Sequence, residues 1–391
     1  MHERYGTITP AVAAFPISGL LCSAQTLAQN AYIPSQLDNT VSVISTATNT
    51  VTTVIHDPSF NYPFPVAVAQ DGSKVYVANF GLNNPDYSVS VIATATNTVT
   101  AVIHDPSLNL PDGIAVTPDG RKVYVANCGG DEVSVIHTAT NTVTTITHPS
   151  FSEAVGVAVT PDGRTVYISN FLGNTVSVID SATDTVTKVI QDPSFNFPWG
   201  AVVTPDGRKV YVVNNGPMFD GNTVSVIDTA TNTVTETITL PDGKGPTSVA
   251  VTPDGSQVYV NNDSDIGVVS VIATATNMVG SIPVDGFSGG VAVTPDGRKV
   301  YDLNGHSDSV SVIATATNNV VGSPIPVGKF PAANGVFIQP RFAGTPGKAN
   351  CFGQSVSALA RTFGGFSRAA AALGFPSVGA LQNAILAFCG G

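Results

Sequence analysis

The chain has 391 residues, of which 43% are hydrophobic and only 11% are charged. Its net charge is −11, with 16 basic against 27 acidic residues, which disfavours duplex nucleic acid as a partner because clustered cations supply most of the affinity for phosphates. The sequence contains no run of eighteen apolar residues, so it predicts no transmembrane span.

Residues 1–28 differ from the rest of the chain. An apolar stretch from Ala11 to Cys22 is followed by small side chains at Thr26 and Ala28. This order is typical of a signal peptide, with cleavage before Gln29. We therefore expect a periplasmic or secreted protein.

The rest of the chain is dominated by internal repeats. The string VSVI recurs seven times, followed each time by a variant of DTATNTV, and successive copies start 41 to 48 residues apart. The copies of VSVI start at Val41, Val89, Val133, Val176, Val224, Val269 and Val310. A second string, resembling TPDGRKVYVAN, occurs only six times. Repeats of this length indicate one structural unit that is copied along the chain.

Each unit is predicted to contain four short strands, A to D. In one copy these strands span 157–160, 165–170, 175–180 and 185–190, and Val, Ile, Thr and Tyr dominate them. Pro-Asp-Gly is suited to the turn between strands A and B because glycine accepts a positive φ. Asn in Ala-Thr-Asn-Thr does the same between strands C and D, since it tolerates the left-handed region.

Four-stranded units of this length, packed radially, form a β-propeller. The first unit lacks strand A, while an unpaired A-like strand occurs late, at 335–338. Joining the two gives seven complete blades and leaves no blade edge exposed at the seam. The sequence thus predicts an all-β, seven-bladed propeller over 29–341, closed by its terminal strand.

The TPDGRKVYVAN and NTVSVIDTATNTV strings resemble the YVTN-type β-propeller repeat family of exported bacterial and archaeal proteins, over roughly residues 31–340. The resemblance implies a seven-bladed ring, an extracytoplasmic location and a binding or surface role. One periplasmic branch of that family binds single-stranded DNA, so single-stranded nucleic acid stays an alternative partner.

The best candidate site is the mouth of the central channel, because the B–C loops and D–A crossovers on that face vary between units. Small residues precede strand A and would let the crossovers approach the axis, so the residues before them should ring the pore. The candidate ligand-binding residues are Phe64, Asp112, Glu153, Trp199 and Asn334. They suit a small amphipathic or sugar-like ligand. The alternative is that they only seal the channel.

No hydrolase, nucleotide-binding or zinc-protease motif occurs, and the histidines lack the spacing of metal ligands, so neither a catalytic residue nor a cofactor is predicted. The leading hypothesis is an exported, non-enzymatic protein that binds a small molecule, glycan or protein. A second is a lyase or hydrolase that uses Asp112 and Glu153 as acid and base. A third is a structural component of the cell envelope.

Residues 342–391 read as a linker and a small α-helical module. Serines at 355, 367 and 377 precede short apolar helical patterns. So small a unit has little core of its own, and in an oxidising compartment Cys351 and Cys389 would form a disulfide that stabilises it. Cys128 would remain single.

Overall fold

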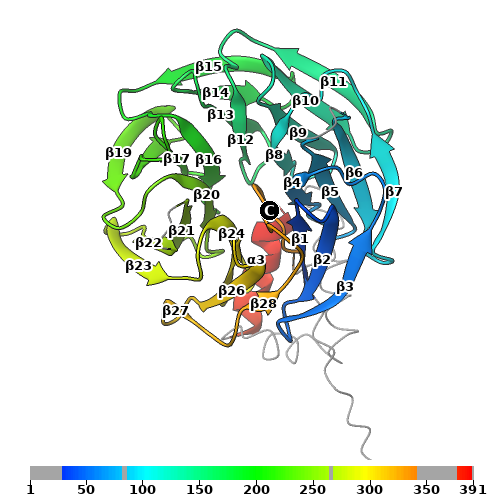
Figure 1. Cartoon of the computed structure of the whole chain (residues 1–391). Coiled ribbons are helices and arrows are strands. Elements are labelled where there is room, and N and C mark those ends of the chain that lie inside the picture. The colour runs from blue at the N-terminus through cyan, green and yellow to red at the C-terminus, as the bar shows by residue number, and fades with distance from the viewer. Residues whose placement is uncertain (1–28, 82–85, 264–266, 341–376, 390–391) are drawn as a thin grey trace, which may run out of the picture.

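The computed structural model describes residues 29–81, 86–263, 267–340 and 377–389. Their strands form seven sheets arranged around a central axis, as Figure 1 shows. The predicted seven-bladed, nearly all-β propeller is confirmed. No helix in these ranges is long and apolar enough to cross a bilayer.

Within a blade, strand A lies nearest the axis and strand D lies outermost. Blade 1 contains β1 (Asn30–Ser35), β2 (Thr40–Ser45) and β3 (Thr50–His56). Blade 2 contains β4 (Pro63–Val68), β5 (Lys74–Asn79), β6 (Ser88–Ala93) and β7 (Thr98–Ile103). Blade 3 contains β8 (Pro111–Val116), β9 (Lys122–Asn127), β10 (Glu132–His137) and β11 (Thr142–Thr147). Blade 4 contains β12 (Ala154–Val159), β13 (Thr165–Asn170), β14 (Thr175–Asp180) and β15 (Thr185–Gln191).

The remaining blades follow the same order. Blade 5 contains β16 (Pro198–Val203), β17 (Lys209–Asn214), β18 (Thr223–Asp228) and β19 (Thr233–Thr239). Blade 6 contains β20 (Pro246–Val251), β21 (Gln257–Asn262), β22 (Val268–Ala273) and β23 (Met278–Pro283). Blade 7 contains β24 (Ser288–Val293), β25 (Lys299–Asn304), β26 (Ser309–Ala314), and an outer strand in two pieces, β27 (Asn319–Val320) and β28 (Ile325–Pro326).

The core lies between the blades. Strands B and C of each blade are almost wholly buried, as in β5, while strand D alternates between exposed and half-buried residues, as in β7. Each hydrophobic cluster joins neighbouring blades; for example, Tyr76 of blade 2 packs in the same cluster as Val123 of blade 3. Blade-to-blade packing therefore provides most of the buried apolar area.

The turns adopt the predicted conformations. All six glycines of the Asp-Gly turns have a positive φ, between 68° and 73°. The fourth residue of every C–D turn, such as Asn49 or Asp184, is also left-handed, with φ between 51° and 56°. These turns make up one face of the ring, which we call the turn face. The B–C loops and the D–A crossovers make up the opposite face, which we call the loop face.

The ring is closed as the sequence predicts. Backbone bridges pair Ala31 with Ile338 and Ser35 with Pro331, and the Tyr32 N–H donates to the Phe337 carbonyl at 2.9 Å. The last propeller segment, residues 331–338, is therefore strand A of blade 1. We call it the seam strand.

Strand A begins earlier than the sequence suggests. In blade 4 it starts at Ala154 rather than at residue 157, and its register with β13 shifts between Ala154 and Gly156. The same shift occurs in every blade from 2 to 7. The pairing of strand A with strand B therefore continues on both sides of a β-bulge. An alternating pattern of residues does not reveal such a bulge, so the sequence places the start of the strand too late.

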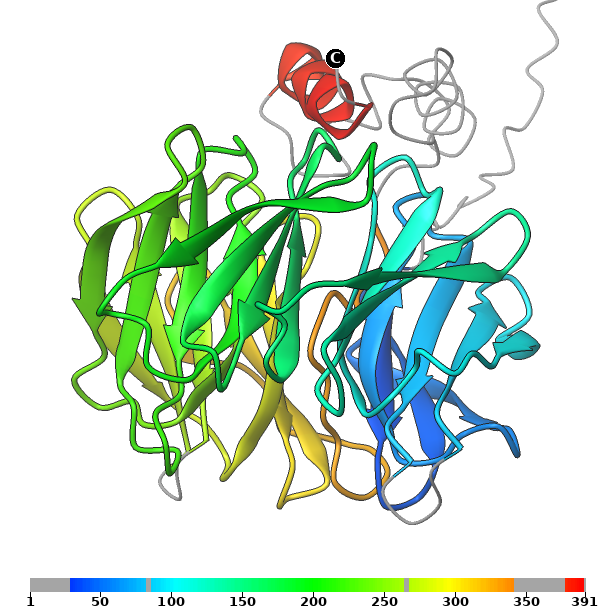
Figure 2. The ribbon, with the colours of Figure 1, turned by 90° about the horizontal axis from the view of Figure 1, so that it is seen from above.

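Helix α3 (Val378–Cys389), the one helix within the described ranges, lies over the turn face, as Figure 2 shows. The helix begins after Ser377, as the sequence predicts, and Ser377 caps it by accepting the Ala380 N–H at 3.1 Å. Leu381 and Ile385 are buried. The signal peptide, the other two predicted helices and Cys351 lie outside the described residues. The disulfide to Cys389 stays a prediction.

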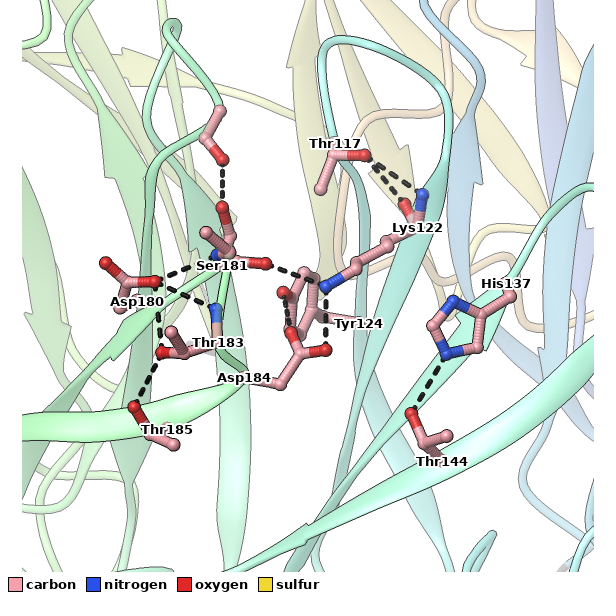
Figure 3. Close-up of polar contacts among 12 residues, drawn as sticks. Thr117, Lys122, Tyr124, His137, Thr144, Asp180, Ser181, Thr183, Asp184 and Thr185 are labelled. Atoms are coloured by element: carbon pink, nitrogen blue, oxygen red, sulfur yellow. Dashed lines mark hydrogen bonds and ion pairs between the residues drawn. The ribbon is translucent and has the colours of Figure 1, made fainter.

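A repeated hydrogen bond joins neighbouring blades. The buried tyrosine of strand B donates to the left-handed Asn or Asp in the C–D turn of the next blade. Five such pairs occur: Tyr32–Asn97, Tyr124–Asp184, Tyr167–Asn232, Tyr259–Asn318 and Tyr301–Asn49. In blade 3 the contact is charged, because Lys122 Nζ lies 2.7 Å from Asp184 Oδ2 (Figure 3). The tyrosine of KVYVAN and the asparagine of TATNT are thus two halves of one contact.

Two tyrosines test the value of this bond. Tyr124→Phe should lower the free energy of unfolding by about 1–3 kcal/mol, because it removes a donor from the half-buried Asp184 carboxylate. Tyr211→Phe is the matched control, since the Tyr211 hydroxyl is buried without a partner, and it should change stability by less than about 0.5 kcal/mol. Urea unfolding measures both variants. Equal losses would show that the bond adds nothing beyond ring packing.

Candidate functional site

The strands approach the axis most closely at the bulge of strand A. A Cβ atom added to Gly113 would lie 2.0 Å from the Val155 carbonyl oxygen, and one added to Gly156 would lie 2.2 Å from that of Trp199. Such distances leave no room for a side chain, which confirms the predicted reason for small residues here. The channel therefore narrows toward the loop face.

The seam strand differs from the other A strands at this level. Eight residues, from Pro331 to Ile338, span a stretch that six residues, Pro63 to Val68, span in blade 2. The extra length places Gly335 against two other blades, because an added Cβ would lie 2.5 Å from the Val66 carbonyl oxygen and 3.0 Å from that of Ile114. The seam strand thus extends over blade 2 to blade 3.

This extension brings Asn334 to Asp112. Asn334 Nδ2 donates to the Asp112 main-chain carbonyl at 3.3 Å, although the two residues are 222 positions apart. The Asp112 side chain is only 5% exposed. Burial raises the pKa of its carboxyl to about 7. The nearby Asn334 amide and Trp199 indole lower this pKa, and the Glu153 carboxylate raises it further. Asp112, Trp199, Asn334 and Glu153 therefore form one cluster near the axis.

The polar atoms of this cluster are incompletely satisfied. Asp112 Oδ1 and Trp199 Nε1 are both buried, and neither has a hydrogen bond of normal geometry to a described residue. The indole approaches the carboxylate closely enough to lower its pKa, but not in the geometry of a full bond. An acceptor and a donor thus face the same region without a partner, which costs free energy.

Cys128 also borders the cluster. Burial raises the pKa of its thiol to about 12, and the Asp112 and Glu153 carboxylates add to the shift. The thiol is therefore protonated at neutral pH and is not an activated nucleophile. The Glu153 side chain is half-buried, and its backbone adopts a left-handed φ of 49°.

Trp199 belongs to an aromatic group on the loop face of blades 4 and 5. Its ring lies 5.1 Å from that of Phe171, edge to face, and 6.2 Å from that of Phe219. The Phe197 ring also packs against that of Phe171, edge to face, with 4.9 Å between their centroids. Met218, which precedes Phe219 in the same B–C loop, is 81% exposed, and Phe219 is 48% exposed. The result is an apolar shelf next to the buried carboxylate.

Phe64 is placed apart from this cluster. It occupies the same strand position in blade 2 that Trp199 occupies in blade 5, but its ring packs edge to face against Phe80 at 6.4 Å. Tyr62 packs on Phe80 as well, at 6.2 Å. Of the five predicted ligand-binding residues, the structure therefore brings four together and leaves Phe64 in a separate aromatic group.

Sequence reasoning missed three features. Phe171 and Phe219, which complete the shelf, lie in B–C loops that the sequence marks only as variable. Asp302 is a fully buried carboxylate at a strand position that holds Val or Ile in the other six blades. The string KVYDLN in place of KVYVAN is the signal that could have found it. Asp302 lies within blade 7, outside the cluster at the axis.

Across the described ranges, no group of three or more His, Cys, Asp or Glu side chains is placed to hold a metal ion. Basic side chains are scarce in the described loops of the loop face, where Lys244 and Lys329 are the two present, while aspartates are frequent. The cluster and its surroundings are therefore negatively charged.

No family model matches the chain, and no curated protein matches it. The YVTN resemblance accordingly stays a prediction. Solved structures do match. Hydrazine synthase of Kuenenia stuttgartiensis aligns with a TM-score of 0.63 and 21% identity, over 72% of this chain and 92% of that chain.

Two further structures align over most of their length. A functionally unknown protein from Desulfotomaculum acetoxidans has a TM-score of 0.63 and 19% identity, over 78% of this chain and 99% of that chain. A provisionally assigned 6-phosphogluconolactonase from Bacteroides uniformis has a TM-score of 0.66 and 16% identity, over 78% and 98%. At these identities the similarity shows the propeller fold alone.

The buried carboxylate makes stability depend on pH. The Asp112 pKa is about 7 in the folded chain against 3.8 for the free side chain, so the folded state favours the protonated form. Stability should therefore fall as pH rises from 4 to 7, by at most about 4 kcal/mol. Asp112→Asn should remove this loss and be more stable than the wild type at pH 8, but not at pH 4.

Urea unfolding at pH 4, 6 and 8 measures this difference. Asp220→Asn serves as the control, because Asp220 is an exposed aspartate on the same face. A constant difference between wild type and Asp112→Asn across this range would show that Asp112 keeps an ordinary pKa.

Proposed function

We propose that the chain is an exported binding protein whose loop face holds a small amphipathic or sugar-like molecule at the channel mouth. The observation that carries the proposal is the pair of buried, unpartnered atoms, Asp112 Oδ1 and Trp199 Nε1. A hydroxyl group can accept from the indole N–H and donate to the carboxylate at the same time. A ligand hydroxyl would thus satisfy both atoms.

The surroundings of this pair suit the rest of such a ligand. The shelf of Trp199, Phe171 and Phe219 offers an apolar surface beside the polar atoms. Sites for small ligands combine apolar and aromatic walls with a few placed polar groups. The excess of carboxylates over lysines on the loop face disfavours an anionic ligand. We therefore expect a neutral or cationic molecule with several hydroxyl groups.

Export and ligand binding can be read from one sample. Protein isolated from the envelope fraction of its own cell should give a denatured mass that starts at Gln29, and a larger native mass that includes the ligand. Trp199→Phe keeps a ring on the shelf but removes the N–H, and Asp112→Asn removes the charge. Asp112→Asn should weaken the affinity about tenfold or more, since a hydrogen bond to a charged group is worth about 1.5–3 kcal/mol, and Trp199→Phe should weaken it less, since its bond joins two neutral groups. The ligand-bound fraction should fall in both variants.

The control for this experiment is Phe64→Leu. Phe64 holds the matching strand position but lies in a separate aromatic group, so ligand retention should not change. A wild-type native mass equal to the bare chain or its oligomer would contradict ligand binding. A denatured mass that includes residues 1–28 would contradict export by the predicted signal peptide.

A catalytic alternative rests on a different observation, the Asp112 pKa of about 7 beside Glu153. A carboxyl that titrates near neutral pH is suited to general acid–base catalysis, as in a lyase or hydrolase. If this alternative holds, the ligand recovered from the native complex is turned over, and kcat/KM follows a pKa near 7. Asp112→Asn and Glu153→Gln should each lower kcat at least about a hundredfold. Recovery of the ligand unchanged after incubation with the wild type would contradict catalysis.

A further inference from the structure

The central channel beneath the cluster is a second candidate site. A cavity of about 340 Å³ extends along the ring axis. Its wall comes from the A strands β4, β8, β12, β16, β20 and β24, together with the seam strand. Asn334 and Gly335 lie at its loop-face end, while Gln70, Pro118 and Pro161 lie at its turn-face end. Asn334 is the one residue of the axial cluster that lines it.

The wall is aliphatic. Apart from the residues at the two ends, it consists of Val, Ala and Ile, such as Ala115, Val157 and Val202, and it contains neither a charged nor an aromatic side chain among the described residues. The A strands read as Val-Ala-Val because both of their faces meet apolar surroundings. Val336 of the seam strand is 60% exposed although it lines the channel.

Such a wall favours an apolar occupant. Each Å² of apolar surface that faces water costs roughly 25 cal/mol, and apolar cavities bind apolar molecules rather than ordered water. The polar groups along the wall are those of the backbone at the inner edges of the A strands, and no side chain between the two ends offers a hydroxyl group a partner. In blade 4 the lining runs from Val157, near the loop face, to Pro161, at the turn face. At about 3.3 Å per residue, the channel is therefore roughly 15 Å deep. The space is therefore long and narrow.

Entry is from the turn face. The loop-face end is the narrower one, because the bulge glycines there leave no room for a Cβ between adjacent A strands and Asn334 and Gly335 of the seam strand line it. The opposite end lies among the Asp-Gly turns. Helix α3 lies over this face in Figure 2, but none of its described residues lines the channel.

We propose that the channel binds the unbranched aliphatic chain of an amphiphile, inserted from the turn face with its end toward Asn334. The head group remains at the turns. This site is distinct from the ligand site on the loop face and does not depend on it.

The test uses the full chain and two probes, 1-decanol and decanoate, in isothermal titration calorimetry below the concentration at which either probe aggregates. Saturable binding of one molecule per chain is expected for at least one probe. Val336→Phe places a ring in the channel and should weaken binding about tenfold or more. Because Val336 is exposed in the free protein, this variant should retain the wild-type unfolding curve.

Leu37→Phe is the matched control. Leu37 is also 60% exposed, but it lies in a B–C loop on the loop face, so its replacement should leave binding unchanged. Binding of 1-decanol alone would identify a neutral head group, and binding of decanoate alone an anionic one; both support the proposal.

The proposal is overturned if neither probe binds saturably, or if Val336→Phe binds as tightly as the wild type. Asp112→Asn separates the two sites. It should leave the binding of these probes unchanged, because the Asp112 side chain does not line the channel and the hydrogen bond from Asn334 Nδ2 to the Asp112 main-chain carbonyl is kept in the variant. Loss of ligand binding on the loop face can therefore be distinguished from loss of probe binding in the channel.

Discussion

Closure of the ring by the seam strand is the constraint on which the rest of the structure depends. Among the described residues, blade 1 has no strand before β1, and pairing with residues 331–338 completes it. The seam strand is also two residues longer than the corresponding stretch in blade 2, so it bulges toward the axis. That bulge carries Asn334 to Asp112 and Gly335 to blade 2. The segment that holds the ends together therefore also builds the floor of the candidate site and the end of the channel.

The repeated strings serve the contacts between blades rather than any chemistry. Tyrosine in strand B and asparagine or aspartate in the C–D turn meet across five of the seven blade boundaries, and the left-handed turn fixes the acceptor, as in Tyr301 and Asn49. At the axis, glycines such as Gly156 let backbones meet at contact distance. Because these contacts recur between blades, their residues are copied, while the loop face is free to differ.

This division explains what could be predicted. Seven blades, their turns and the terminal closure follow from local patterns that recur in every unit. The cluster does not, because it joins Asn334 of blade 1, Asp112 of blade 3 and Trp199 of blade 5, and only the ring curvature and the bulge register place these side chains together. Phe64 and Trp199 hold equivalent strand positions, yet their loop neighbours, Phe80 and Phe171, lie in different aromatic groups.

Asp112 is the residue whose presence the fold does not explain. The bulge position is filled in other blades by Val155 or Thr247, so the ring closes without a carboxylate there. Burying one raises its pKa to about 7 and leaves Oδ1 without a partner, both of which destabilise the folded chain at neutral pH. A destabilising group on an otherwise repetitive scaffold is better accounted for by what it binds than by what it holds together. The seam strand then separates two different environments, a polar and aromatic mouth above Asn334 and an aliphatic channel below it.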